Sequence, residues 1–302
     1  MIKKTLHFSN PAYLSLNHKQ LVIRTTEGNN ENKFTRPIED IGVMIIESHQ
    51  VTLTSALISY LLENNVAIVT CDKYHLPQGL MLNLSGNTLQ SERFTAQISA
   101  SLPLKKQLWQ QTVQAKIANQ AASLQISTGT ETGCMKKWAQ TVKSGDSDNL
   151  EGRAAAYYWR NLFPPELKFV RDQWGEPPNH YLNYGYIVLR AIIARALTGS
   201  GLLPTLGIHH CNRYNAYCLA DDIMEPYRPF VDLVVLEIIE RYGYDAPLDK
   251  EVKKLLLSIP VIDVIIDNKR SPLMVAASTT TASLAKCFLG LQRKILYPTM
   301  SK

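Results

Sequence analysis

Residues 104–117, LKKQLWQQTVQAKI, carry a clear helical pattern. Their apolar side chains recur every four or five positions, at Leu104, Leu108, Val113 and Ile117. One face of an α-helix repeats with this period, so we expect a long helix here, with Lys105, Lys106 and Lys116 between the apolar positions. The stretch belongs to a region, beginning near Ser91, in which glycines are rare and helical periodicity dominates.

The helical pattern continues toward the end of the chain. It predicts further helices at residues 151–162, 181–198, 222–241, 250–257 and 279–296. We therefore interpret residues 91–302 as one large all-α domain.

The residues before this region have a different hydrophobic pattern. Short apolar or alternating runs predict strands at residues 2–8, 13–16, 20–25, 41–46 and 66–71. Turn-forming clusters separate them, such as Ser9-Asn10-Pro11 and Gly28-Asn29-Asn30. Thr52 or Thr54 is expected to cap one helix in this part, which ends near Asn64.

These patterns predict an α+β multidomain fold. A small β-rich N-terminal domain would span residues 1–72 and a larger all-α domain residues 91–302. Residues 73–90, which include Pro77, Gly79 and Gly86, are expected to form the linker.

The composition indicates a globular protein that is soluble and cytoplasmic. Of 302 residues, 45% are hydrophobic and 19% charged, which excludes a disordered chain. The net charge of +6 modestly favours a polyanionic partner such as nucleic acid. The five cysteines form no CxxC pair, so reduced thiols are expected. No apolar run approaches the roughly 18 residues of a membrane span, and no membrane association is expected.

Glu151 is the first candidate for chemistry. It begins the sequence EGRAAAYYW, in which small residues would let a ligand or another backbone approach closely. A glutamate in the first turn of a helix also complements the helix dipole. The local sequence therefore leaves both a structural and a functional role open.

The second candidate is the histidine pair in LGIHHCNRYN, residues 206–215. Either His209 or His210 could ligate a metal through a neutral ring nitrogen, or could be an ordinary surface or core histidine. Cys211 and Cys218 lie nearby, but the spacing His-His-Cys-x6-Cys matches no closed structural zinc site.

The third candidate is the acidic segment LADDIMEPYRP, residues 219–229. Asp222 and Glu225 are three positions apart and would share one face of a helix. Carboxylates this close repel one another unless a cation lies beside them, and Mg²⁺ or Mn²⁺ prefers such oxygen ligands. The alternative is a solvated, acidic helix start that pairs with Arg228.

Taken together, these segments resemble the CRISPR adaptation integrase, the Cas-one family, and the likeness runs through essentially the whole chain. It includes the strand at 41–46 followed by Glu47, the run 52–71 that ends in Cys71-Asp72, and the motif LNYGY at 182–186. The details are most similar to members that accompany type II systems.

The resemblance implies a β-rich dimerisation domain, a helical catalytic domain, and a homodimer. It implies that two such dimers bind a dimer of the small Cas-two protein, giving a heterohexamer that acts on double-stranded DNA. The type II likeness adds the effector nuclease and accessory adaptation proteins to the candidate partners.

The resemblance also implies a set of metal ligands. Glu151, His210 and Glu225 match the family's ligands to one divalent cation, Mg²⁺ or Mn²⁺, and so its catalytic residues. Asp222 is expected as an alternative ligand or as a residue that supports one. Many family members have Asp where this chain has Glu225, so the longer side chain shifts the geometry but keeps the chemistry.

The implied reaction inserts captured DNA fragments into a CRISPR array. The 3′-hydroxyl of the fragment attacks a phosphodiester, and no nucleotide cofactor is needed, in agreement with the lack of a GxxxxGK[ST] phosphate loop. Arg153 and Arg213 are candidates for phosphate binding. The alternatives are a structure-selective, metal-dependent DNase that uses water at the same site, and a DNA-capture scaffold without catalysis.

Overall fold

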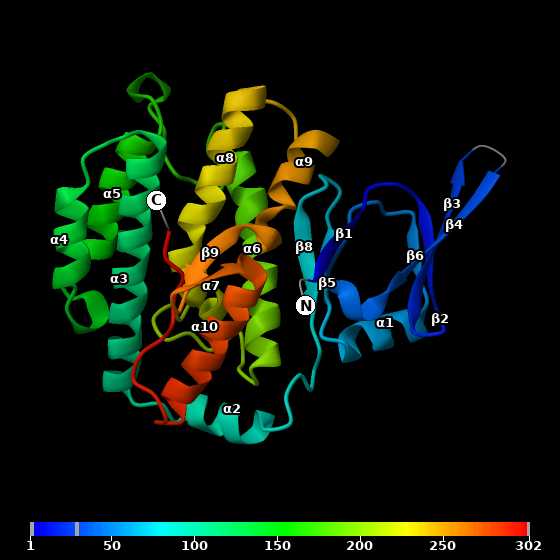
Figure 1. The fold of residues 1–302 in the computed structure, drawn as a ribbon, viewed down its shortest axis with the longest axis horizontal. Helices are drawn as coiled ribbons and strands as arrows, with labels where there is room; N and C mark the ends of the chain where they lie inside the picture. The colour runs from blue at the N-terminus through cyan, green and yellow to red at the C-terminus, as the bar shows by residue number, and fades with distance from the viewer. Residues whose placement is uncertain (1–2, 28–29, 301–302) are drawn as a thin grey trace.

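The computed structural model describes residues 3–27 and 30–300. A β-rich part formed by the N-terminal residues lies beside a larger helical part (Figure 1). The mixed fold predicted from the sequence is therefore confirmed. None of the helices in the described residues combines the length and hydropathy that crossing a bilayer requires.

The outer sheet of the β-rich part has four strands in the order β4-β3-β2-β6. Its strands are β2 (Ala12–Asn17), β3 (Gln20–Glu27), β4 (Asn30–Pro37) and β6 (Val51–Leu53). The predicted strands at 13–16 and 20–25 lie within β2 and β3. The predicted turn at 28–30 falls partly outside the described residues.

The inner sheet has the order β1-β5-β7-β8, in which β8 alone is antiparallel to its neighbour. Its strands are β1 (Lys4–Phe8), β5 (Ile41–Ile46), β7 (Ala67–Cys71) and β8 (Pro77–Met81). The predicted strand at 41–46 is confirmed at both ends. The first residue of the strand expected at 2–8 lies outside the described residues.

Strand β5 is buried along its whole length because both faces of the inner sheet are covered. Met44 and Ile46 pack into a small core with helix α1 (Ser55–Glu63) and the outer sheet. Val43 and Ile45 pack into the large core of the helical part. A continuous apolar run such as IGVMII is typical of a strand covered on both faces.

The predicted linker is not a simple connection. Strand β8 lies inside residues 73–90 and pairs with β7, so the inner sheet continues beyond the predicted boundary at residue 72. Thr54, one of the two predicted caps, accepts a hydrogen bond from the backbone N–H of Leu57 at 3.3 Å and begins α1.

The helical part is built around two long helices, α3 (Leu102–Ser127) and α6 (Asn179–Gly199). The other α-helices of the described residues are α2 (Gln90–Ile98), α4 (Gly133–Thr141), α5 (Leu150–Leu162), α7 (Cys218–Met224), α8 (Arg228–Tyr242), α9 (Lys250–Leu256) and α10 (Leu273–Phe288). Short 3₁₀ turns occur at Ile38–Asp40, Ser144–Asp146, Pro165–Leu167, Glu225–Tyr227 and Ile259–Val261.

Two of the predicted helices differ from the structure. The helix expected at 222–241 is interrupted by the 3₁₀ turn at Glu225–Tyr227, because Pro226 and Pro229 each lack the N–H that helix continuation requires. The helix expected at 279–296 is instead α10, which ends at Phe288. Gly290 has a left-handed φ of 73°, a backbone conformation that stops helices.

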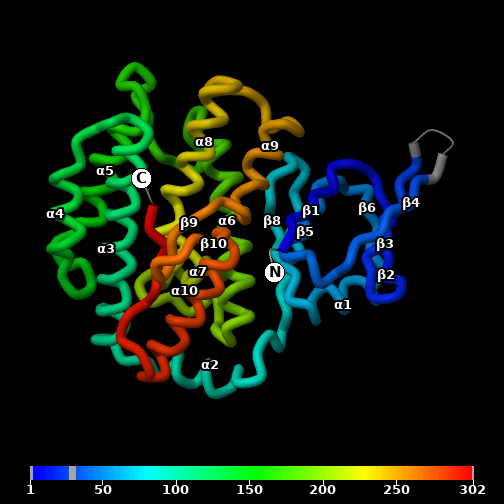
Figure 2. Tube along the Cα trace, viewed as in Figure 1, coloured from blue at the N-terminus to red at the C-terminus, as the bar shows by residue number. Residues whose placement is uncertain are grey.

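The helical part is not wholly α. Strands β9 (Asp263–Ile266) and β10 (Lys269–Pro272) form a small hairpin before α10. The segment after α10 then runs back along α3 (Figure 2). It is held there by hydrogen bonds, including one of 2.8 Å between the hydroxyls of Thr112 and Tyr297.

Candidate active site

Glu151 lies in the first turn of α5, and its backbone is held by the residues before it. The carboxylate of Asp146 accepts hydrogen bonds from the backbone N–H groups of Leu150 and Glu151, each at 2.9 Å. Asn149 has a left-handed φ of 51° and caps the helix through the N–H of Gly152 at 3.3 Å. The start of α5 therefore has a defined position, from which the Glu151 side chain extends.

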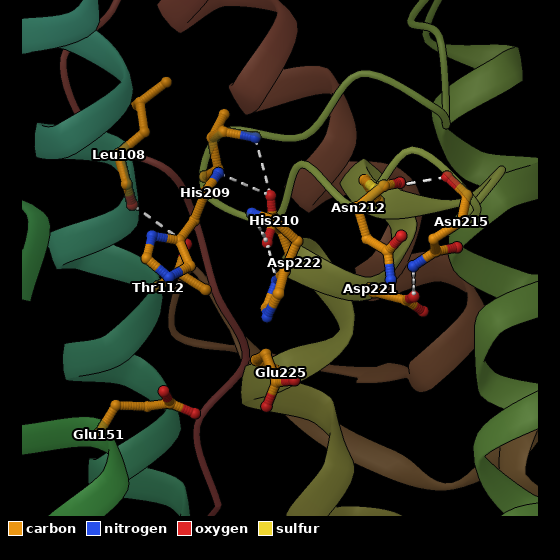
Figure 3. Close-up of polar contacts among 12 residues, drawn as sticks. Leu108, Thr112, Glu151, His209, His210, Asn212, Asn215, Asp221, Asp222 and Glu225 are labelled. Atoms are coloured by element: carbon orange, nitrogen blue, oxygen red, sulfur yellow. Dashed lines mark hydrogen bonds and ion pairs between the residues drawn. The ribbon is translucent and has the colours of Figure 1, made fainter. Parts of the chain in front are cut away.

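Asp222 organises the loop that carries the two histidines (Figure 3). Its carboxylate is fully buried and accepts hydrogen bonds from the backbone N–H groups of Ile208, His209 and His210 at 2.7, 2.9 and 3.2 Å. Gly207 permits this turn, because a Cβ there would lie 2.8 Å from Oδ2 of Asp222. Asp222 thus acts on the loop backbone.

The same carboxylate orients the His210 ring. Nδ1 of His210 lies 2.5 Å from Oδ1 of Asp222, and this hydrogen bond is the largest cause of a raised pKa for His210. An ionised carboxylate only accepts, so Nδ1 carries the proton and Nε2 is the free acceptor of the neutral ring. Figure 3 shows the imidazole between Asp222 and Glu225.

Glu225 is buried between two cations. Its Oε2 lies 2.6 Å from Nζ of Lys116, and its Oε1 lies 3.0 Å from a guanidinium nitrogen of Arg228. Burial alone would raise the pKa of Glu225, but the charges of Arg228 and Lys116 outweigh it and hold that pKa below its usual value. Glu225 is therefore ionised at neutral pH.

Lys116 joins two of the three predicted ligands. Its ammonium pairs with Glu151 as well as with Glu225, although its side chain is only 9% exposed. Burial would lower the pKa of Lys116, but the two carboxylates outweigh it and raise that pKa. The sequence pattern identified Lys116 only as a lysine between apolar positions. A break in the amphipathic pattern could have drawn attention to it.

The three acidic residues of the segment 221–225 face different partners. Asp221 pairs with Arg190 at 2.7 Å and accepts a hydrogen bond from Asn215, away from the other two. Asp222 binds the histidine loop and Glu225 binds Lys116. The pairing of Glu225 with Arg228 is present, but the segment is buried, so it is not the solvated helix start that was the alternative.

Trp109 of α3 supports the histidine loop from the other side. The ring of His209 stacks on the buried indole with centroids 4.1 Å apart and planes 2° apart. The ring of His210 meets the indole edge-on at 5.6 Å. The two adjacent histidines thus have different surroundings, and His210 is the one that approaches the carboxylates.

The two predicted DNA-binding arginines lie outside these contacts. The guanidinium of Arg153 lies over the ring of Trp138 at 4.8 Å, and that of Arg213 over the exposed ring of Tyr214 at 4.6 Å. Both arginines are at the surface, and phosphate binding by them stays a prediction. Cys211 and Cys218 are free thiols, and neither belongs to a metal-binding group in the described residues.

The donor set suits a hard divalent cation. The candidate donors are two carboxylates and the free Nε2 of an imidazole, and the buried Oε2 of Glu225 has no hydrogen-bond partner among the described residues, only its ion pair with Lys116. No three acidic, histidine or cysteine side chains in that part of the chain are already arranged around one point. Lys116 lies between the two glutamates instead.

Access to this cluster comes from one side. The side chains of Glu151 and His210 are 30% and 48% exposed, whereas that of Glu225 is 6% exposed. A ligand from solvent would therefore meet Glu151 and His210 before Glu225.

Comparison with known proteins agrees with this architecture. A family model described as CRISPR associated protein Cas1 matches residues 6–259. The chain is 37% identical over 285 residues to the CRISPR-associated endonuclease Cas1 of Neisseria meningitidis serogroup C (strain 8013), which covers 94% of this chain and 91% of the relative.

Solved structures share the fold. A casposase bound to integration product aligns with a TM-score of 0.79 at 21% identity, over 98% of this chain and 92% of that chain. A chain of a Cas6-RT-Cas1–Cas2 complex aligns with a TM-score of 0.72 at 19% identity, over 97% of this chain and 36% of that chain. Since the family model spans most of the sequence and a relative is more than one third identical along it, the chain belongs to the Cas1 family of CRISPR-associated proteins.

Proposed function

We propose that the chain is a metal-dependent DNA endonuclease and integrase that inserts captured DNA fragments into a CRISPR array. The observation that carries this proposal is that Glu151 and Glu225, from separate elements, pair with one buried ammonium of Lys116, while the charges of both carboxylates act on the ring of His210. Membership of the Cas1 family supports it, as does the relative that is named an endonuclease.

Glu151, His210 and Glu225 would hold Mg²⁺ or Mn²⁺. When bound, the cation supplies polarisation of the phosphate and stabilisation of the charge on the attacking and leaving oxygens. Asp222 keeps the proton of His210 on Nδ1, which leaves Nε2 as the ligating atom. The half-buried Arg228 stays beside Glu225 and preserves its ionised form.

The proposed reaction is a transesterification. The 3′-hydroxyl oxygen of the fragment bonds to phosphorus at the repeat boundary, and the bond to the old 3′-oxygen breaks. The attacking hydroxyl loses a proton and the departing oxygen gains one, so the exchange is balanced without a nucleotide cofactor. Hydrolysis differs only in that water replaces the 3′-hydroxyl.

The proposed partners follow from the family and from the solved complexes. We infer a homodimer that binds double-stranded DNA and assembles with a Cas2 dimer, since a similar fold occurs in a complex that contains Cas1 and Cas2. Type II association, with its effector nuclease, stays a prediction. DNA binding through phosphates would weaken steeply as salt concentration rises.

A strand-transfer assay tests the proposal. Labelled DNA fragments and a plasmid with a repeat are incubated with the chain, Cas2 and Mg²⁺ or Mn²⁺. Glu151→Gln, His210→Ala and Glu225→Gln should each abolish joined products while leaving DNA retention in EDTA intact. The exposed Glu166→Gln is the matched control and should keep full activity.

His209→Ala should reduce joining much less than His210→Ala, because His209 contacts Trp109 and not the carboxylates. If two of the three ligand variants joined DNA normally, the site would be misassigned. Nicked plasmid without joined product would favour the hydrolytic DNase instead. DNA retention without any metal-dependent chemistry would favour a capture scaffold.

A further inference from the structure

The ammonium of Lys116 occupies a position that a divalent metal ion would need if it bound the same glutamates. Its ammonium binds Glu151 and lies 2.6 Å from Oε2 of Glu225, so two of the three proposed ligands already share one positive charge. The side chains of Lys116 and Glu225 are both below 10% exposed, so these charges are largely removed from water. A buried charge requires a partner, and each of these groups is the other's partner.

Glu151 and Glu225 cannot keep their present contacts with the Lys116 ammonium and also bind a divalent ion. A divalent ion held by carboxylate oxygens takes the electron pairs that now accept from the ammonium, and the two cations repel each other at short range. No group of three ligating side chains in the described residues is gathered around one point. The two glutamates are arranged around Lys116 instead.

We propose that Lys116 is a resident competitor of the divalent ion, which keeps Glu151 and Glu225 together before the ion binds and is displaced by it. This inference rests on the proposed function, since it concerns the same site. Once displaced, the ammonium lacks its carboxylate partners and is available to a phosphate of bound DNA, an anion that lysine accepts as a point charge.

A coupling between metal and DNA follows from this exchange. Without DNA, binding of the divalent ion must overcome the ion pairs of Lys116. With DNA, the displaced ammonium gains a new anion, so each ligand should strengthen the binding of the other by the same factor. Removal of the Lys116 charge should make metal binding tighter and should abolish most of this coupling.

Calorimetric titration of the chain with MnCl₂ tests the proposal, with and without a DNA duplex. We expect Lys116→Gln to bind Mn²⁺ about tenfold more tightly than the unchanged chain, a factor equal to about 1.4 kcal/mol. DNA should tighten Mn²⁺ binding in the unchanged chain and have little effect in Lys116→Gln. Lys106→Gln, an exposed lysine on the same helix, is the control and should behave like the unchanged chain.

Thermal unfolding keeps the test decisive if Lys116→Gln folds poorly. In EDTA, Lys116→Met should have a lower Tm than the unchanged chain, because Glu225 loses one buried partner, and Mn²⁺ should raise its Tm by more than it raises that of the unchanged chain. Lys116→Arg, which keeps the charge, should keep the weaker Mn²⁺ binding.

The outcomes separate this inference from the proposed function. Equal or weaker Mn²⁺ binding by Lys116→Gln would overturn the competitor role while leaving the metal site intact. Absence of Mn²⁺ binding in every variant, and in the unchanged chain, would overturn the proposed metal site itself. Reduced joining by Lys116→Gln together with tighter Mn²⁺ binding would support both.

Discussion

Asp222 accepts four hydrogen bonds from one loop, three from backbone N–H groups and one from the ring of His210. Sequence reasoning left its role open between a ligand and a supporting residue. The contacts agree with support: both oxygens are occupied, and the side chain is fully buried. At the scale of single residues, the adjacent Asp221 and Asp222 therefore have different roles: Asp221 pairs with Arg190, and Asp222 holds the histidine loop.

This assignment predicts the effect of Asp222→Asn. Asparagine has one acceptor oxygen and no charge, so it cannot satisfy the loop and hold the His210 ring together. We expect strand transfer to fall roughly 10- to 100-fold, as when a residue that orients a metal ligand is changed. Asp221→Asn is the matched control, because Asp221 pairs with Arg190 away from the site. An equal loss in both variants would contradict the assignment.

At the scale of elements, α5 depends on one left-handed residue. Asn149 combines a φ of 51° with the cap of the helix that carries Glu151. Asn149→Ala should lower the free energy of unfolding by about 2 kcal/mol, because it loses the cap and strains the backbone. Asn149→Gly should lower the free energy of unfolding by only about a few tenths of a kcal/mol, since glycine tolerates the conformation. Urea unfolding measures both, and equal losses would show that the left-handed backbone is unimportant.

A buried acid, Asp232, lies where α5, α6 and α8 pack together, and its contribution to the free energy of unfolding depends on pH. Asp232 accepts hydrogen bonds from Tyr158 and Tyr186 at 2.8 and 2.6 Å, yet burial raises its pKa from 3.8 to about 6. The folded state therefore holds this proton more tightly than the unfolded state. This group's contribution to stability should fall as pH rises from about 4 to about 6, and remain low above that.

Asp232→Asn removes the ionisation and tests this behaviour. Urea unfolding of both proteins between pH 4 and pH 7 should show the variant gaining relative to the unchanged chain as pH rises, by up to about 3 kcal/mol. The wider contribution of other carboxylates cancels in the difference. Parallel stability curves for the two proteins would mean that Asp232 does not titrate in this range.

At the scale of the whole molecule, Glu47 connects the β-rich part to the helical part. It follows β5, lies 2.5 Å from Nε2 of His7, and lies 2.7 Å from Nζ of Lys253 on α9. Glu47→Leu alone should lower the free energy of unfolding by about 3 to 5 kcal/mol, because it leaves the buried Lys253 unpaired. Lys253→Met alone should cost less, because Glu47 keeps its hydrogen bond with His7. The double variant should lose less than the two single losses combined, as measured by thermal unfolding. Additive losses would show that the pair is not coupled.

Local sequence patterns predicted much of the fold, namely those strands and helices whose ends depend on nearby residues. The strand at 41–46 was predicted at both ends because an apolar run between polar residues has few alternatives. Pro226 and Gly290 interrupted or ended predicted helices through their backbone chemistry. The continuation of the inner sheet into β8 was missed, since pairing with β7 is a non-local contact.

The sequence by itself determined the family, the mixed fold and the identity of Glu151, His210 and Glu225 as candidates, because motifs and periodicity are local properties. Only the tertiary structure decided how these side chains are used. It buries Lys116 between two glutamates from distant segments and separates Asp221, Asp222 and Glu225 by their partners. Burial and charge pairing arise from packing of helices far apart in the chain, and no spacing along one segment encodes them.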